Sequence, residues 1–165
     1  MISIEQVFHN IPMTKELIII FFLLLALILL KQSIKKTSYK KKQIKGAKYE
    51  KLVSQRYQKE NYDVYEKGLK EGFKDAGIDL VARKNDEILL IQCKNWDINN
   101  KYRVREKEVR EFYGACQFYI DEKGLNKHNT ICIYIVPDAK LILPNAKGLF
   151  KKHYKNCRFE IIYMK

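Results

Sequence analysis

The stretch GIDLVARKNDEILLIQCKNW, residues 77–96, decides how this chain folds. Two runs rich in Val, Ile and Leu, residues 78–83 and 87–94, lie on either side of Asn85 and Asp86. Asn and Asp tolerate the left-handed backbone conformations of two-residue turns, so the two runs are expected to pair as antiparallel strands. The sequence therefore predicts a β-hairpin near the middle of the chain.

The register of this hairpin gathers polar side chains at its open end. A turn at positions 85 and 86 places Asp79 opposite Gln92, and two residues further out it places Gly77 opposite Lys94, on the same sheet face. Opposed Cβ atoms lie about 5 Å apart. Taken singly, Asp79 also suits a turn-flanking carboxylate and Lys94 a lysine that extends into solvent. Together they predict a patch that can hold a divalent cation and a phosphate.

The remaining segments predict one mixed α/β domain over residues 46–165. Apolar residues recur at helical spacing in residues 46–60 and 104–121, and strand patterns follow the first helix and the second. The run ICIYIV, residues 131–136, is typical of a strand buried on both faces. The expected order is α-β-β-β-α-β-α-β, with strands at 62–66, 78–83, 87–94, 131–136 and 158–164 and a short helix after Pro144.

The charge of the chain indicates an anionic partner. Its net charge is +13 and its isoelectric point is near 9.5. Residues 46–165 keep 24 basic against 17 acidic side chains, a net charge of +7. A basic surface of this kind favours nucleic acid or an anionic membrane surface as partner, and the charge of the domain favours nucleic acid.

The cysteines do not predict a metal site. The four of them lie far apart in the sequence, with no C-x-x-C pair, and the chain has three histidines at no ligand spacing. We therefore expect buried apolar thiols in a reducing compartment: Cys93, Cys116, Cys132 and Cys157.

An apolar segment near the N-terminus predicts a membrane anchor. Residues 17–30, LIIIFFLLLALILL, are uninterrupted by any polar residue. As a helix they extend about 21 Å, short of the roughly 30 Å hydrocarbon core. Apolar residues 11–13 and Ile34 lengthen the helix, and Lys15 and Lys31 extend their amines toward the interfaces. The segment is therefore expected to span the membrane once.

The lysines that follow orient this anchor. Residues 31–48 contain eight lysines and no acidic residue, which places the C-terminal domain in the cytoplasm. These lysines favour contact with anionic lipid, with DNA as the alternative partner. The prediction is a single-pass protein of the inner (cytoplasmic) membrane. Its parts are a short extracytoplasmic N-terminus at 1–16, a transmembrane anchor at 17–34, a basic juxtamembrane linker at 35–45 and a domain at 46–165.

Three motifs of the domain resemble a known family. They are DAGIDLVA at 75–82, LIQCKNW at 90–96 and EVREFYGA at 108–115. Together they are similar to the catalytic domain of Mrr-like restriction endonucleases, which belong to the PD-(D/E)XK superfamily, over residues 46–165. The resemblance implies a restriction-endonuclease-like mixed sheet flanked by helices. It also implies a metal-dependent DNA endonuclease that serves restriction of foreign DNA or DNA processing.

The resemblance assigns roles to individual residues. Asp79 matches the metal-binding aspartate, and Gln92-Cys93-Lys94 matches the Q-x-K motif, with glutamine in place of the usual acidic residue. These give Asp79, Gln92 and Lys94 as catalytic residues. A glutamate of the first helix completes the site in relatives, and Glu50 fits that place, with Glu60 as its rival.

The implied cofactor is Mg²⁺, with Mn²⁺ as the alternative, because its ligands are hard oxygen atoms. The expected ligands are Glu50, Asp79, Gln92 and the backbone carbonyl of Cys93. No small-molecule cofactor is implied. The implied substrate is DNA, and a homodimer is left open. Expected DNA contacts are Trp96, through stacking, and the cations Lys101, Arg103 and Arg105.

The chain departs from the family pattern at two places. Ile78 stands where the superfamily has proline, and IVPDAKLILPNAK at 135–147 replaces a Thr- or Ser-rich stretch. The P-D-x-K string at 137–140 imitates the family motif without a hairpin partner, so we interpret it as a loop. A catalytically idle, membrane-tethered DNA-binding module and a structural component of a membrane assembly remain the rival hypotheses.

Overall fold

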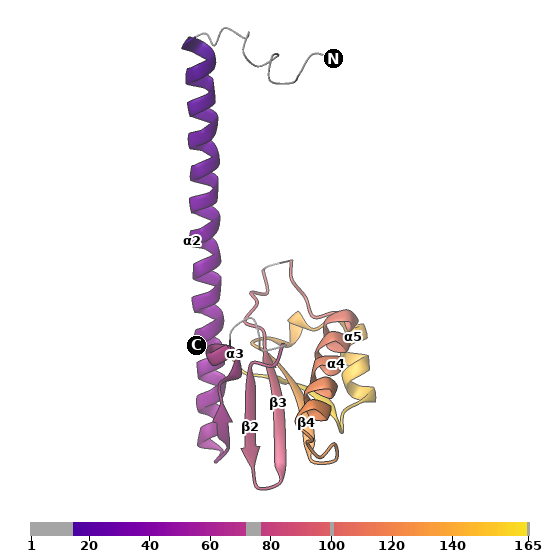
Figure 1. The fold of residues 1–165 in the computed structure, drawn as a ribbon. Helices are drawn as coiled ribbons and strands as arrows, with labels where there is room; N and C mark the ends of the chain where they lie inside the picture. Colours follow the sequence, from indigo (N-terminus) through magenta and orange to yellow (C-terminus); the bar gives the residue numbers. More distant parts are fainter. Residues whose placement is uncertain (1–14, 72–76, 100, 165) are drawn as a thin grey trace, which may run out of the picture. The chain divides into compact units, whose positions relative to one another are not determined.

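The computed structural model describes residues 15–71, 77–99 and 101–164 of the chain. It divides the chain between Lys42 and Gln43 into two compact units, each treated by itself below. The helix α2, Lys15–Lys59, contributes residues to both units (Figure 1). The segment expected as a linker, residues 35–45, is helical throughout as part of α2.

The N-terminal part of α2 is an exposed apolar helix. Its large apolar side chains between Leu17 and Leu30 are 37% to 61% exposed. By length and composition this helix is able to cross a membrane. The expectation of one long apolar helix at this place is confirmed.

The C-terminal unit is built on a mixed five-stranded sheet with the order β1-β2-β3-β4-β5. The pairs β1–β2 and β2–β3 are antiparallel, and β3–β4 and β4–β5 are parallel. The predicted fold class is therefore confirmed. The strands are β1 Asp63–Tyr65, β2 Leu80–Lys84, β3 Glu87–Cys93, β4 Thr130–Val136 and β5 Cys157–Ile161.

The central hairpin has the predicted turn and register. Lys84 pairs with Glu87 and Leu80 pairs with Ile91, so positions 85 and 86 form the turn. Asn85 has a φ of 52°, the left-handed conformation for which asparagine is suited. Turn chemistry is local, which explains why the sequence alone predicts this register correctly.

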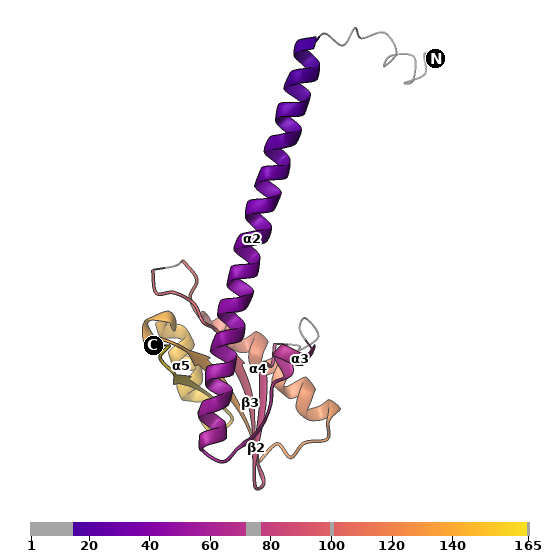
Figure 2. The same cartoon turned by 90° about the vertical axis from the view of Figure 1, so that its left-hand side faces the viewer.

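Helices cover both faces of the sheet (Figures 1 and 2). On one face α4, Glu106–Glu122, packs together with α5, Pro144–Lys152. The buried residues of α4 are Val109, Phe112, Cys116 and Ile120, whose spacing of three to four residues forms one helical stripe. The second helix and the short helix after Pro144 are thus confirmed.

The other face is covered by the last turns of α2. Tyr49, Val53 and Tyr57 recur every four residues and pack on β2, β3 and β4. Two hydroxyl groups then tie this helix to the C-terminal end of the chain. Tyr49 Oη donates to the carbonyl of Ile162 at 2.8 Å, and Tyr57 Oη donates to Glu160 Oε2 at 2.9 Å.

Two short helices were not predicted. The first is α3, Lys67–Glu71, between β1 and β2, and the second is η2, Ala139–Leu141, after β4. Asp138 begins η2, since its Oδ1 accepts a hydrogen bond from the N–H of Lys140 at 2.7 Å. The P-D-x-K string therefore has a structural role in a loop, as interpreted from the sequence. The four cysteines are free and buried, as expected.

Candidate active site

Asp79 lies where the ladder between β2 and β3 becomes irregular. Its N–H donates to the carbonyl of Ile91 at 2.8 Å, one residue out of the register of the hairpin. Its buried carboxylate accepts a hydrogen bond from the N–H of Cys93, with Oδ2 at 2.6 Å. The prediction that Asp79 pairs directly with Gln92 is therefore wrong in this detail, because the strand leaves its regular path just before Leu80.

Glu50 reaches this aspartate from α2, and Gly68 provides the space. A Cβ atom on Gly68 would lie 3.0 Å from Glu50 Oε2 and 3.4 Å from Asp79 Oδ1. The two carboxylates therefore lie close together over the backbone of α3. The N–H of Gly68 also donates to the carbonyl of Asp79 at 2.8 Å, which fixes α3 against this strand. A glycine is needed here because any side chain would enter the space that the carboxylates occupy.

The rival residue Glu60 lies elsewhere. It is exposed, with its carboxylate 3.4 Å from the guanidinium of Arg56, and its carbonyl accepts from Lys84 Nζ at 2.8 Å. Lys84 borders the hairpin turn, at the opposite end of β2 from Asp79. The structure thus brings Glu50, and not Glu60, to the aspartate.

The donor set at this place fits a divalent cation. Two carboxylates supply the charge and the hard oxygen atoms that Mg²⁺ and Mn²⁺ prefer. Within residues 15–71, 77–99 and 101–164, no group of three or more His, Cys, Asp and Glu residues is arranged to hold a metal. The further ligands that the sequence predicts are neutral oxygen atoms, namely the side-chain carbonyl of Gln92 and the backbone carbonyl of Cys93.

The charged groups around Cys93 agree with this placement of the carboxylates. Burial is the main reason why the pKa of this thiol lies well above its usual value. The negative charges of Asp79 and Glu50 raise its pKa further, whereas the positive charge of Lys94 lowers it. The two carboxylates and the lysine therefore all lie close enough to the Cys93 thiol to change its pKa. We call these three charged groups one electrostatic neighbourhood.

Gln92 and Lys94 border a cavity of about 300 Å³ on the side of the sheet that faces α4. Gly77 adopts a φ of 79°, and a Cβ on it would lie 3.2 Å from Gln92 Nε2. This glycine therefore brings the backbone close to the Gln92 amide, whereas the regular register of the hairpin places it opposite Lys94. The lining residues are Gly77, Gln92, Lys94, Trp96, Glu108, Glu111, Phe112, Ala115 and Tyr134.

The predicted DNA-binding residues are only partly available for DNA. Arg103 donates from its guanidinium to the carbonyls of Ile98 and Tyr102, both at 2.7 Å. Arg105 precedes α4 and pairs with Glu108 at 2.6 Å, and Lys101 is exposed. Of the four residues, the structure brings Trp96 to Lys94, since both line the cavity.

Two residues of this region were missed from the sequence. The role of Gly68 could have been suspected from the sequence, because a glycine among helix-forming residues in KGLKE suggests a close approach of the backbone. For Tyr134, no sequence pattern indicated a role at the site. It is the register partner of Gln92 on β4, a contact between segments about forty residues apart in the sequence, and its position within an apolar strand suggested a core residue.

One solved structure is similar to part of this chain. The crystal structure of a repair endonuclease from Pyrococcus abyssi is similar at 17% sequence identity, with a TM-score of 0.38. The similarity covers 52% of this chain and 32% of that one, so the chain spans about a third of that structure. No curated protein sequence matches the chain.

The family model described as restriction endonuclease (Mrr_cat) matches residues 41–129, more than half of the chain. The match contains Glu50, Asp79, Gln92 and Lys94. Nucleases of the PD-(D/E)XK type generally use divalent metals, in agreement with the donor set above. The chain therefore belongs to the restriction endonuclease family and carries its nuclease catalytic domain.

Proposed function

We propose that this protein is a membrane-anchored, Mg²⁺-dependent endodeoxyribonuclease that hydrolyses phosphodiester bonds. It serves restriction of foreign DNA or DNA processing. One observation carries the proposal: the carboxylates of Glu50 and Asp79 converge over Gly68, in the electrostatic neighbourhood of Lys94. A module that only binds DNA has no need for two neighbouring acidic groups, a buried Asp79 and a partly buried Glu50, beside its phosphates, so the arrangement favours hydrolysis over the idle alternative.

The residues divide the chemical work between them. Glu50, Asp79 and Gln92 would hold Mg²⁺, which would stabilise negative charge on the phosphoryl oxygens and make water more acidic. Lys94 orients the attacking water and stabilises the charge that develops on the phosphate. The N–H of Cys93 fixes Oδ2 of Asp79, and Oδ1 lies beside Gly68, as does Glu50 Oε2. Cys93 is therefore a positioning residue through its backbone.

The charge of the domain supports DNA as substrate. Residues 46–165 carry a net charge of +7 although two acidic residues belong to the site itself. Lys101 and Arg105 are the exposed cations that we assign to phosphate contacts. Arg103 holds the backbone that precedes α4, so its contribution to DNA binding is indirect.

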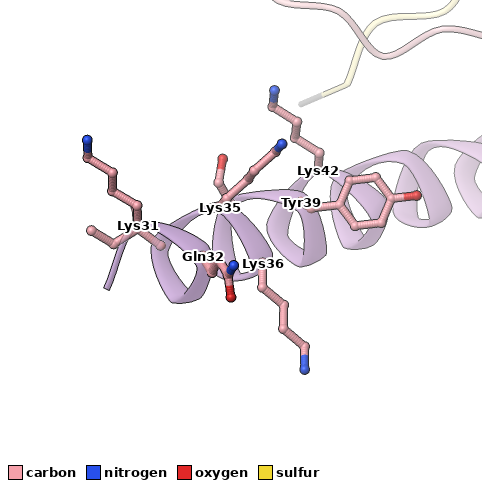
Figure 3. A pocket seen from close by; sticks show the side chains of 8 residues that line it. Lys31, Gln32, Lys35, Lys36, Tyr39 and Lys42 are labelled. Atoms are coloured by element: carbon pink, nitrogen blue, oxygen red, sulfur yellow. The ribbon is translucent and has the colours of Figure 1, made fainter. Parts of the chain in front are cut away.

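The exposed apolar part of α2 supports the membrane anchor, and the lysines after it support contact with anionic lipid. Figure 3 shows Lys31, Lys35 and Lys42 on one side of the helix and Lys36 on the opposite side. All of these side chains are exposed. Cations that surround a helix suit the headgroup layer, which also surrounds it, better than a partner that approaches from one side. The positive flank supports an orientation with the nuclease domain in the cytoplasm.

Plasmid cleavage by the full chain tests the proposal. The protein should remain in the membrane fraction through a high-salt wash and be released by detergent. In micelles with Mg²⁺ it should nick supercoiled plasmid, and EDTA should stop the reaction. Lys94→Ala should slow cleavage by about 10² or more while DNA binding is kept. Lys152→Ala, which removes an exposed lysine of α5, is the matched control and should cleave normally. DNA binding without cleavage in the unmodified protein would instead establish the idle module.

A further inference from the structure

The cavity beside Lys94 has features that phosphodiester hydrolysis does not require. We propose that it receives one unstacked nucleobase of the DNA, so that the enzyme prefers substrates with an unpaired base next to the cleaved bond. This inference rests on the proposed nuclease function and names its substrate class. It follows from the charge of the cavity, its aromatic walls, a buried hydroxyl group and its size.

The charge of the cavity excludes the DNA backbone. Two glutamates of α4, Glu108 and Glu111, line it against a single lysine, Lys94. The guanidinium of Arg105 is the main cause that lowers the pKa of Glu108 to about 2, so this carboxylate is ionised at any working pH. Phosphates are repelled by such a lining. Carboxylates accept hydrogen bonds, so the part of DNA that fits is a base edge with N–H groups.

Aromatic side chains provide surfaces for a planar ring. Trp96 lines the cavity and contacts Tyr102, with ring centroids 5.8 Å apart. Phe112 lines it from α4 and packs edge-on against Tyr134, with centroids 5.4 Å apart. Bases stack on such rings regardless of their identity, whereas their edges carry the hydrogen-bonding pattern. The cavity combines both kinds of contact.

The hydroxyl of Tyr134 supplies the independent sign of a ligand. This residue lines the cavity, its side chain is fully buried, and its Oη has no hydrogen-bond partner among the residues that the structure describes. Its ring is fixed between Phe112 and Phe150, so the hydroxyl cannot turn out to solvent. Buried hydroxyl groups are nearly always paired. A base edge in the cavity provides the missing partner, directly or through one water molecule.

The size and place of the cavity fix the number of bases. Its volume of about 300 Å³ lies at the lower end of the range for ligand pockets, which is about 300–1,000 Å³. It therefore suits one base. Lys94 belongs both to this lining and to the proposed hydrolytic site, so the base is adjacent to the cleaved bond. A base that is already unpaired reaches such a pocket at the lowest cost, which favours single-stranded, branched or bubble DNA.

Binding without cleavage tests the inference. The full chain in micelles, with EDTA, is titrated with three oligonucleotides: a paired duplex, the same duplex with one unpaired base, and one with an abasic site at that position. Anisotropy of labelled DNA gives the affinity. Trp96 is the only tryptophan of the chain, so its emission reports on the cavity. We expect about tenfold tighter binding of the unpaired base than of the other two, with a change of emission for that DNA alone. Equal affinities and unchanged emission overturn the inference.

Variants assign the preference to this cavity. Tyr134→Phe removes the hydroxyl and keeps the ring, and Trp96→Leu removes the stacking surface. Each should lose most of the preference, and Tyr134→Phe should keep the affinity for paired duplex. Preference retained in both variants overturns the assignment. The two proposals fail separately: cleavage of plasmid without any base preference leaves the nuclease and overturns the pocket, whereas preference without cleavage overturns the nuclease and leaves the pocket.

Discussion

The two ends of the central hairpin differ in how they satisfy their polar groups. At the turn, Lys84 Nζ donates to the carbonyl of Glu60, and Tyr62 Oη donates to Glu87. Each of these donors therefore has a hydrogen-bond acceptor. At the open end, two carboxylates face the same space and the register breaks at Asp79. The hydroxyl of Tyr134 there has no hydrogen-bond partner in the part of the chain that the structure describes. At the turn end, paired polar groups and a regular register stabilise the fold. At the open end, adjacent like charges and an irregular register are tolerated, and the proposed chemistry takes place there.

The largest loss of cleavage is expected when a carboxylate at the open end of the hairpin is replaced. Asp79→Asn keeps the oxygen that accepts from the N–H of Cys93 and removes one negative charge from the proposed metal site. Cleavage should be lost, while the melting temperature and DNA binding are kept or rise, because a charge that repels phosphate has gone. Plasmid cleavage, metal titration by calorimetry and DNA binding measure the three effects. Glu60→Gln at the turn end is the matched control and should cleave normally. Full activity of Asp79→Asn would refute the site.

A smaller effect is expected from a single methyl group. Gly68→Ala places a Cβ 3.0 Å from Glu50 Oε2 and 3.3 Å from the Cα of Asp79, so one of them must move. We expect weaker metal binding and cleavage slowed by about tenfold, since catalysis depends on the exact position of the groups that hold the metal. The control is Gly148→Ala in α5, where a Cβ meets no atom within 4 Å. It should cleave normally and gain about 0.5–1 kcal/mol of stability. Equal activity of both variants would show that Glu50 and Asp79 can accommodate a Cβ atom on Gly68 without loss of function.

The smallest effect is predicted at the neutral ligand. Gln92→Glu keeps the size of the side chain and adds the carboxylate that most of the superfamily uses at this place. Cleavage should be retained, and the affinity for Mg²⁺ should hold or increase. Calorimetric titration with Mg²⁺, beside plasmid cleavage, measures both. Complete loss of activity would mean that Gln92 acts through its amide N–H groups and not as a metal ligand.

The difference between the two ends of the hairpin also explains which features can be predicted from the sequence. The turn at Asn85 and the register up to Leu80 follow from local backbone preferences, and Gln92 and Lys94 are found from the resemblance of one short motif. The contact of Asp79 with the N–H of Cys93 is not predictable in this way, because it depends on where the ladder breaks. Gly68 and Tyr134 come to the site from other elements, so their roles depend on three-dimensional packing.

The hydrogen bond from Tyr49 to Ile162 has a consequence for the synthesis of the protein. Glu50 follows Tyr49 directly, and the partner that holds this turn of helix lies 113 residues further along the chain. The residues before Ile162 also form β5, which closes the sheet beside β4. Contacts so distant in sequence form late in folding. A chain still attached to the ribosome therefore has its apolar helix but no fixed Glu50, and it acquires a nuclease centre only after its last strand has emerged.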